Sequence, residues 1–183
     1  MDDIVRAALA KWPNVPAVYG WLMLDSRGQW RIQGQRITHP ALIQFMQRNY
    51  ECDERGAWFF QNGPQQVFVA LEAAPYVVRY DGQTWTLHTE EAVAPPDQAF
   101  WVDDGDIYLG FGARLARLDD RDLGRVADGF YQADQQPLET PPEAGAIFQM
   151  DAEACIPLTA LSHGALLQRY HIDPHPQPPI QIS

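Results

Sequence analysis

The chain has 183 residues, of which 46% are hydrophobic and 20% charged, and its formal net charge at pH 7 is −11. This length and apolar content predict one ordinary domain or two small ones rather than a disordered chain. The acidic balance supplies no basic surface for a phosphate backbone, so nucleic acid and anionic membranes are not expected as partners. The sequence shows neither a membrane-spanning apolar run nor a basic N-terminal signal, and a cytoplasmic location is expected.

Four β-hairpins are predicted from short apolar runs that flank turn residues. The expected strand pairs are 17–24 with 29–33, 57–60 with 67–71, 76–80 with 84–88, and 100–102 with 107–109. Among the turns, Asp81-Gly82 gives the sharpest signal, because this dipeptide favours the two-residue turns that join antiparallel strands. One more strand is expected over 114–118.

Helices are predicted between these strands from apolar residues at helical spacing. They are expected near 39–50, 120–131 and 158–170, with a short one over 4–10. Leu42, Phe45 and Met46 form the apolar stripe of the first of these, and Pro40 suits its first turn. The predicted fold class is therefore α+β, with mainly antiparallel twisted sheets built from hairpins and about three packed helices.

The order of elements suggests an internal repeat. The same order of elements occurs after Gly28 and again after Gly105: a hairpin, a glycine, a short apolar segment and then a helix. We therefore expect an N-terminal hairpin and helix unit over 1–92 and a second such unit over 93–172, packed on the first. A Pro-rich tail is expected over 173–183.

A series of motifs over residues 17–90 resembles a known family. The motifs are Gly28-Gln29-Trp30, Gly34, Ile37, Leu42, Phe45, Asp53-Glu54-Arg55-Gly56-Ala57-Trp58 and Glu72-Ala73-Ala74-Pro75-Tyr76. They are similar to those of a group of uncharacterised proteobacterial proteins classed as a domain of unknown function. The chain departs from the family pattern in the longer turn 25–28 and in Ala73, where an acid is usual. The resemblance implies repeated β-hairpin and helix units and a role in signal transduction, with no activity assigned.

Motifs for catalysis and cofactor binding are missing from the sequence. Gly110-Phe111-Gly112 lacks the third glycine of a dinucleotide-binding loop, no Gly-Lys-Ser/Thr sequence occurs, and no serine lies in Gly-x-Ser-x-Gly. The thiols of Cys52 and Cys155 have no cationic neighbours in sequence and are expected to be structural. No catalytic residue and no cofactor is therefore predicted.

Acidic residues are concentrated in one region of the chain. Residues 90–153 carry fifteen acidic and four basic side chains, whereas residues 1–89 carry eight of each. We select Asp103, Asp104 and Asp106, in an expected exposed turn, as candidates for contacting a partner. Their spacing is not that of a calcium-binding loop.

One further group has metal ligands at alternate positions. His171, Asp173 and His175 would point to one side of an extended backbone. The surrounding prolines predict a segment whose ordering would cost conformational entropy, so no metal site is expected.

The chain is rich in tryptophan. Trp58, Trp85 and Trp101 lie in expected strands and are candidates for lining a pocket or an interface, since amphipathic rings suit partial burial. The alternative is that the alternating faces of the strands bury these rings in the core.

These observations predict a non-enzymatic binding or regulatory module that recognises a small molecule or a protein partner. Two alternatives remain open. One is an enzyme whose polar site combines residues distant in sequence, and the other is a structural subunit of a homo-oligomer. A deep pocket with convergent ionisable groups would indicate the enzyme, and an apolar surface without such groups would indicate the binding module.

Overall fold

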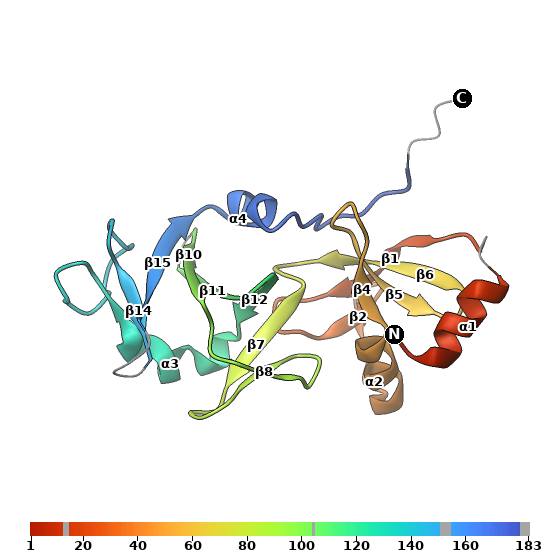
Figure 1. Cartoon of the computed structure of the whole chain (residues 1–183), viewed down its shortest axis with the longest axis horizontal. Helices are drawn as coiled ribbons and strands as arrows, with labels where there is room; N and C mark the ends of the chain where they lie inside the picture. The colour runs from red at the N-terminus through yellow and green to blue at the C-terminus, as the bar shows by residue number, and fades with distance from the viewer. Residues whose placement is uncertain (13–14, 104, 151–154, 180–183) are drawn as a thin grey trace. The chain divides into compact units, whose positions relative to one another are not determined.

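Two β-sheets, one of six strands and one of nine, dominate the computed structural model of the chain (Figure 1). The structure describes residues 1–12, 15–103, 105–150 and 155–179. The chain forms two compact units, one made of Met1–Ala73 and His171–Ser183 and the other of Ala74–Tyr170. Each unit contains one of the sheets. The domain boundaries expected from the sequence stay a prediction.

The first unit contains the six-stranded sheet, in the order β3-β2-β1-β6-β5-β4, and two helices. Its elements are α1 (Asp3–Lys11), β1 (Val18–Leu24), β2 (Trp30–Ile32), β3 (Gln35–Arg36), α2 (Pro40–Arg48), β4 (Tyr50–Cys52), β5 (Trp58–Asn62) and β6 (Gln65–Leu71). The predicted helix near 39–50 is confirmed as α2. His39 caps it by accepting a hydrogen bond from the Leu42 N–H, and Pro40 occupies the first turn.

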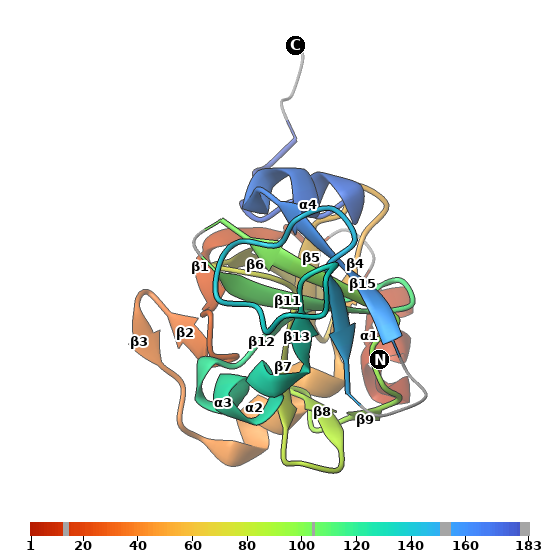
Figure 2. The ribbon, with the colours of Figure 1, turned by 90° about the vertical axis from the view of Figure 1, so that its left-hand side faces the viewer.

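The second unit contains the nine-stranded sheet, in the order β13-β14-β15-β10-β11-β12-β7-β8-β9. Its strands are β7 (Tyr76–Tyr80), β8 (Trp85–Leu87), β9 (Ala92–Val93), β10 (Gln98–Val102), β11 (Asp106–Phe111), β12 (Arg114–Leu118), β13 (Phe130–Tyr131), β14 (Ile147–Gln149) and β15 (Cys155–Leu161). Its helices are α3 (Leu123–Val126), α4 (His163–Arg169) and the 3-10 turns Asp120–Asp122 and Ala127–Gly129. In Figures 1 and 2, α3 and α4 lie on opposite sides of the second unit.

The predicted fold class was wrong, because both sheets are mixed and the protein is mostly β. The four predicted hairpins are present as antiparallel pairs. Parallel pairing, however, joins β1 to β6, β7 to β12 and β10 to β15. Hairpins are specified by the turn between their strands, whereas a parallel pair joins strands separated by a long crossover and leaves no local signal.

Two of the expected helices are much shorter than the sequence suggested. In the range 158–170 the chain continues as β15 to Leu161, and α4 begins only after Ser162, whose hydroxyl caps it by accepting from the Ala165 N–H. In the range 120–131 the single predicted helix is replaced by α3, which has four residues, and by two 3-10 turns. None of the helices in the described part of the chain is long and apolar enough to cross a membrane.

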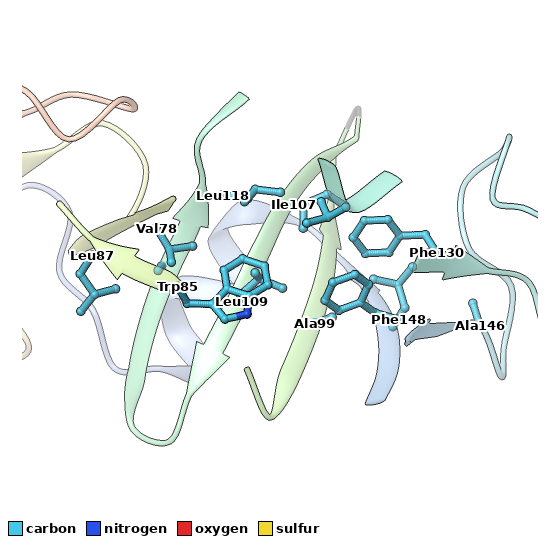
Figure 3. Packing of buried hydrophobic residues seen from close by; sticks show 13 residues of the cluster. Val78, Trp85, Leu87, Ala99, Ile107, Leu109, Leu118, Phe130, Ala146 and Phe148 are labelled. Atoms are coloured by element: carbon cyan, nitrogen blue, oxygen red, sulfur yellow. The ribbon is translucent and has the colours of Figure 1, made fainter. Parts of the chain in front are cut away.

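The core of the second unit joins residues from opposite ends of its strand order. Trp85 and Leu87 of β8 belong to the same buried cluster as Phe130 of β13 and Phe148 of β14 (Figure 3). The rings of Phe130 and Phe148 stack with their centroids 4.4 Å apart. Strands from both ends of the order, β8 and β9 at one end and β14 and β15 at the other, also line one cavity, so the nine-stranded sheet curves.

The C-terminal segment of the first unit pairs with the loop before β5. Asp173 forms a parallel bridge with Ala57 and donates its N–H to the Gly56 carbonyl at 2.9 Å. The Leu71 N–H donates to the Pro174 carbonyl at 2.9 Å. Gly56 has φ of +82°, and a Cβ on it would lie 2.0 Å from the His171 carbonyl oxygen. Glycine is therefore required at this position for the segment to pack.

We expect the substitution Gly56→Ala to detach this segment from the first unit. The left-handed backbone alone costs an alanine about 1–2 kcal/mol, and the contact with His171 adds steric exclusion. Hydrogen exchange at the amides of Leu71 and Asp173 is the measurement, and both should lose protection. Gly63→Ala is the matched control, because Gly63 also has positive φ but has open space around it. Equal protection in the two variants would contradict the role assigned to Gly56.

Candidate functional site

A cavity of about 450 Å³ lies between α2 and the sheet of the first unit. It is lined by Val18, Trp21 and Leu22 of β1, Ile32 of β2, Leu42 and Met46 of α2, Phe60 and Asn62 of β5, and Gln65 and Val67 of β6. Its volume is in the range of small-molecule sites in proteins. Eight of these ten residues are apolar, so the cavity is a candidate site for an apolar ligand.

An irregularity in β1 brings three of its side chains to this cavity. Val18 pairs with Val67 and Leu22 with Val69, so residues 19–21 of β1 oppose a single residue of β6. Gly20 lies within this bulge and has φ of +74°. Side chains of a regular strand alternate between faces, so Val18 and Trp21 would then point to opposite sides. In this strand both line the cavity.

Helix α2 forms the opposite wall. Leu42 and Met46 are one helical turn apart and both line the cavity. The neighbouring Phe45 fixes the helix on the sheet, because its ring meets the Phe60 ring edge-on with centroids 5.5 Å apart. The predicted stripe of α2 therefore serves two purposes, packing the helix and lining the cavity.

The cavity has a buried floor and an exposed apolar rim. Leu22, Met46 and Phe60 are at most 6% exposed. Trp21 is 59% exposed, Ile32 43% and Leu42 39%, and these are three of the six large hydrophobic residues exposed in the described part of the chain. Large apolar side chains gathered around a cavity mouth mark a binding surface more strongly than the same residues scattered singly.

The polar residues of the cavity are two uncharged amides. Asn62 and Gln65 face each other across the turn of the β5–β6 hairpin. The Gln65 side-chain nitrogen donates to the Pro16 carbonyl at 3.3 Å, which leaves its oxygen as an acceptor. None of the described lining residues is charged or titrates near neutral pH. The cavity therefore offers hydrogen bonds at one end and no acid or base for catalysis.

The acidic residues predicted to contact a partner lie in the other unit. Asp103 and Asp106 are exposed at the β10–β11 turn, and Asp104 lies outside the described residues. A carboxylate oxygen of Asp103 accepts from the His163 N–H at 3.2 Å. Asp106 accepts two hydrogen bonds from the Arg117 guanidinium, at 2.7 and 3.2 Å. Both carboxylates therefore form hydrogen bonds with residues of their own unit.

The three predicted tryptophans are found in three different surroundings. Trp58 belongs to the first unit, where its ring packs against Tyr50 with centroids 4.7 Å apart. Trp101 is partly buried beside the turn at Gly105. Trp85 is 2% exposed, and its ring stacks on Tyr80 at the wall of a cavity of the second unit. Of the three rings, Trp101 lies beside the turn that carries Asp103 and Asp106, whereas Trp58 and Trp85 lie elsewhere.

The residues that line the cavity of the first unit are not apparent from the sequence pattern. The pattern predicts a strand around Trp21, but the cavity depends on the bulge that redirects this side chain. The available signal was Gly20, because a glycine inside a strand pattern often marks a bulge or a close backbone approach. The described residues contain no group of three or more His, Cys, Asp or Glu arranged to hold a metal ion.

Comparison with known proteins gives a family and two structural neighbours. The model of the family DUF2944, described as "Protein of unknown function (DUF2946)", matches residues 1–177. No curated protein matches the chain. The crystal structure of a DUF1285 family protein from Silicibacter pomeroyi DSS-3 is similar with a TM-score of 0.55 and 19% identity, over 82% of this chain and 85% of that one. The second is a DUF1285 family protein from Shewanella baltica OS155, with a TM-score of 0.43 and 14% identity, over 57% of this chain and 87% of that one.

Proposed function

The chain belongs to the DUF2944 family, and we propose that it is a non-enzymatic binding module whose first unit takes a neutral, apolar small molecule. The observation that carries this proposal is the Gly20 bulge, which places the exposed Trp21 at the rim of an apolar cavity. A solvent-exposed tryptophan held by an irregular strand has no evident packing role, and bulges often redirect a side chain beside a functional site.

The cavity wall specifies the chemistry of the ligand. Burial of a charged group among these residues would lack a counter-ion, because the described lining residues are all uncharged. The amides of Asn62 and Gln65 supply hydrogen bonds at one end, and the aliphatic and aromatic side chains cover the rest. The best-fitting ligand has an apolar body and a neutral hydrogen-bonding group.

The same wall favours binding over catalysis. General acid–base chemistry needs a titratable group within hydrogen-bond distance of the substrate, and nucleophilic chemistry needs an activated hydroxyl, thiol or amine. The described residues of this cavity supply neither. An enzyme remains the alternative proposal, and it would require a site built from other residues.

A regulatory role follows from the exposure of the rim. A ligand seated against Trp21, Ile32 and Leu42 would cover apolar surface that is otherwise open to solvent. Occupancy would then change the affinity of this surface for a second molecule, which is the basis of a signalling response. We include this role in the proposal.

A protein partner is the second candidate function. The observation that favours it is the exposure of Asp103 and Asp106 on one turn of a strongly acidic region. We propose a basic protein as the partner, because charged surfaces accelerate association with their opposites. Asp103→Asn with Asp106→Asn should slow its association at low salt, and unchanged association kinetics would remove this turn from the interface. If the chain instead forms a homo-oligomer, its molecular mass in solution should increase with protein concentration.

Titration with the neutral fluorescent dye Nile red tests the small-molecule site. We expect the full chain to bind the dye and Trp21→Gln to weaken the binding at least tenfold, because the substitution removes an aromatic face of the rim. Trp12→Gln is the matched control, since Trp12 is 51% exposed but is not among the described residues that line the cavity. Equal losses in the two variants, or a wild-type chain that does not bind, would overturn the proposal.

A further inference from the structure

A second cavity, of about 410 Å³, opens in the second unit where the two ends of the curved sheet approach each other. Trp85 of β8 and Val93 of β9 line it from one end of the strand order, and Phe148 of β14 and Ile156 of β15 from the other. Trp85 and Phe148 are labelled in Figure 3. The mouth of a curved or closed sheet is a frequent position for a ligand, because the strands hold the walls rigidly.

The cavity wall contains a stacked pair of aromatic rings. The rings of Tyr80 and Trp85 lie 4.4 Å apart between centroids, with an angle of 26° between their planes. Trp85 is buried and supports the pair from the core, whereas Tyr80 is partly exposed. Tyr80 therefore presents an aromatic surface whose position is fixed before any ligand arrives.

The other walls are also flat or adaptable. Pro95 and Pro96 line the cavity with rigid rings, and Met150 contributes a thioether. Aromatic faces stack on planar rings, and methionine sulfur makes favourable contacts with ring edges. These walls fit a planar ring better than a bulky saturated group.

Polar groups lie at the edges of this surface. Gln83 and Thr84 line the cavity, and their position is fixed because the Asp81 carboxylate accepts their N–H groups at 2.9 and 2.8 Å. An adjoining cavity of about 370 Å³, which shares Tyr80, Phe148 and Met150, is lined by Arg125 and Asp128. The charges of Arg125 and Asp128 cancel. This surface therefore offers hydrogen-bond donors and acceptors but favours neither a cationic nor an anionic ligand.

We propose that this part of the second unit is a second binding site, which takes an uncharged planar heteroaromatic ring stacked on Tyr80. Ring nitrogens and exocyclic groups would exchange hydrogen bonds with Thr84 and Gln83. The proposal is independent of the cavity in the first unit, since the two sites share no residue.

Free adenine is a suitable probe, because it is planar, uncharged at neutral pH and carries both donors and acceptors. We expect its addition to the full chain to shift the NMR signals of the Trp85 indole N–H, the Thr84 amide and the Met150 methyl group. Cyclohexanol, which is not planar, should leave these signals in place. Equal shifts with the two compounds, or shifts confined to residues of the first unit, would overturn the proposal.

Three variants test whether the ring binds at Tyr80 and Thr84. Tyr80→Leu keeps an apolar side chain but removes the ring, and we expect it to weaken adenine binding at least tenfold. Tyr19→Leu is the matched control, because Tyr19 also stacks on an aromatic neighbour, Phe68, at 4.5 Å, but belongs to the first unit. The milder Thr84→Val, at an exposed position, should weaken binding several-fold without disturbing the core. Unchanged affinity in both Tyr80→Leu and Thr84→Val would contradict the site.

Discussion

Replacement of Asp122 with alanine is expected to lower the free energy of unfolding by about 2–3 kcal/mol. The Asp122 side chain is 2% exposed, and its carboxylate accepts hydrogen bonds from Arg79, Arg125 and the backbone N–H of Tyr80. The distances run from 2.7 to 3.2 Å. The alanine would leave all these donors without their acceptor.

The expected loss is smaller than for a fully buried ion pair. Arg79 and Arg125 are 48% and 52% exposed, so water can solvate both guanidinium groups after the substitution. The Tyr80 N–H and the packing of the 3-10 turn at Asp120–Asp122 carry the remaining cost. The hydrogen bond from Arg79 lowers the pKa of Asp122, so the carboxylate stabilises the fold above its ordinary pKa and loses this effect as the pH falls below it.

Chemical denaturation of Asp122→Ala and of a control variant measures this loss. Asp128→Ala is the control, because Asp128 is an exposed acid in the same segment, and its substitution should change stability by less than about 0.5 kcal/mol. Similar small changes in both variants would show that the arginine contacts contribute little to the folded state.

The parts of the fold that the sequence predicted are those specified by neighbouring residues. The hairpin of β7 and β8 forms around Asp81-Gly82 as expected, although its loop spans the four residues 81–84, and the stripe of Leu42 and Met46 lies on α2. The parallel contact of β10 with β15 has no such signal, because Ala99 pairs with Leu158 across most of the second unit. Strand pairing at this separation depends on the whole chain, and residue patterns alone left the sheets antiparallel.

The acids at 119–122 show which contacts a short sequence pattern can predict and which it cannot. The helix expected near 120–131 would have these acids at its N-terminus, and Asp119 does cap the 3-10 turn there by accepting from the Arg121 N–H. Burial alone would raise the pKa of Asp119, but the hydrogen bonds from Arg121 outweigh it and lower this pKa to about 2. Arg79, which binds Asp122, is 43 residues away, and no short-range pattern indicates such a partner.

The site was harder to predict than the fold, because it depends on an exception to strand alternation. Trp21 would be one more half-buried strand residue if β1 were regular. The bulge at Gly20 makes it part of a cavity wall, together with residues of α2 and β5 that the sequence places far away. Trp58, Trp85 and Trp101 are candidates because they lie in expected strands, and a strand position does not show which ring faces a cavity. Trp85 does line one, in the second unit.

Mild acid is expected to destabilise the fold through His88. The ring nitrogen Nε2 of His88 is buried, although an edge of the residue reaches solvent. Nδ1 accepts the Val77 N–H at 3.3 Å, which fits a neutral ring. Burial lowers the pKa of His88 from 6.5 to about 3. The imidazole therefore stays neutral in the folded chain at pH values where the unfolded chain is protonated.

The direction of the pH effect follows from this difference. Above pH 6.5 both states are neutral and His88 causes no pH dependence, whereas below it the unfolded chain binds a proton that the folded chain does not. Between pH 7 and pH 5 we expect a loss of about 1–2 kcal/mol in the free energy of unfolding, measured by denaturation at each pH. His88→Gln, which keeps an acceptor but does not titrate, should flatten this dependence, and the exposed His175→Gln should leave it unchanged. A wild-type slope that persists in His88→Gln would assign the acid sensitivity to other groups.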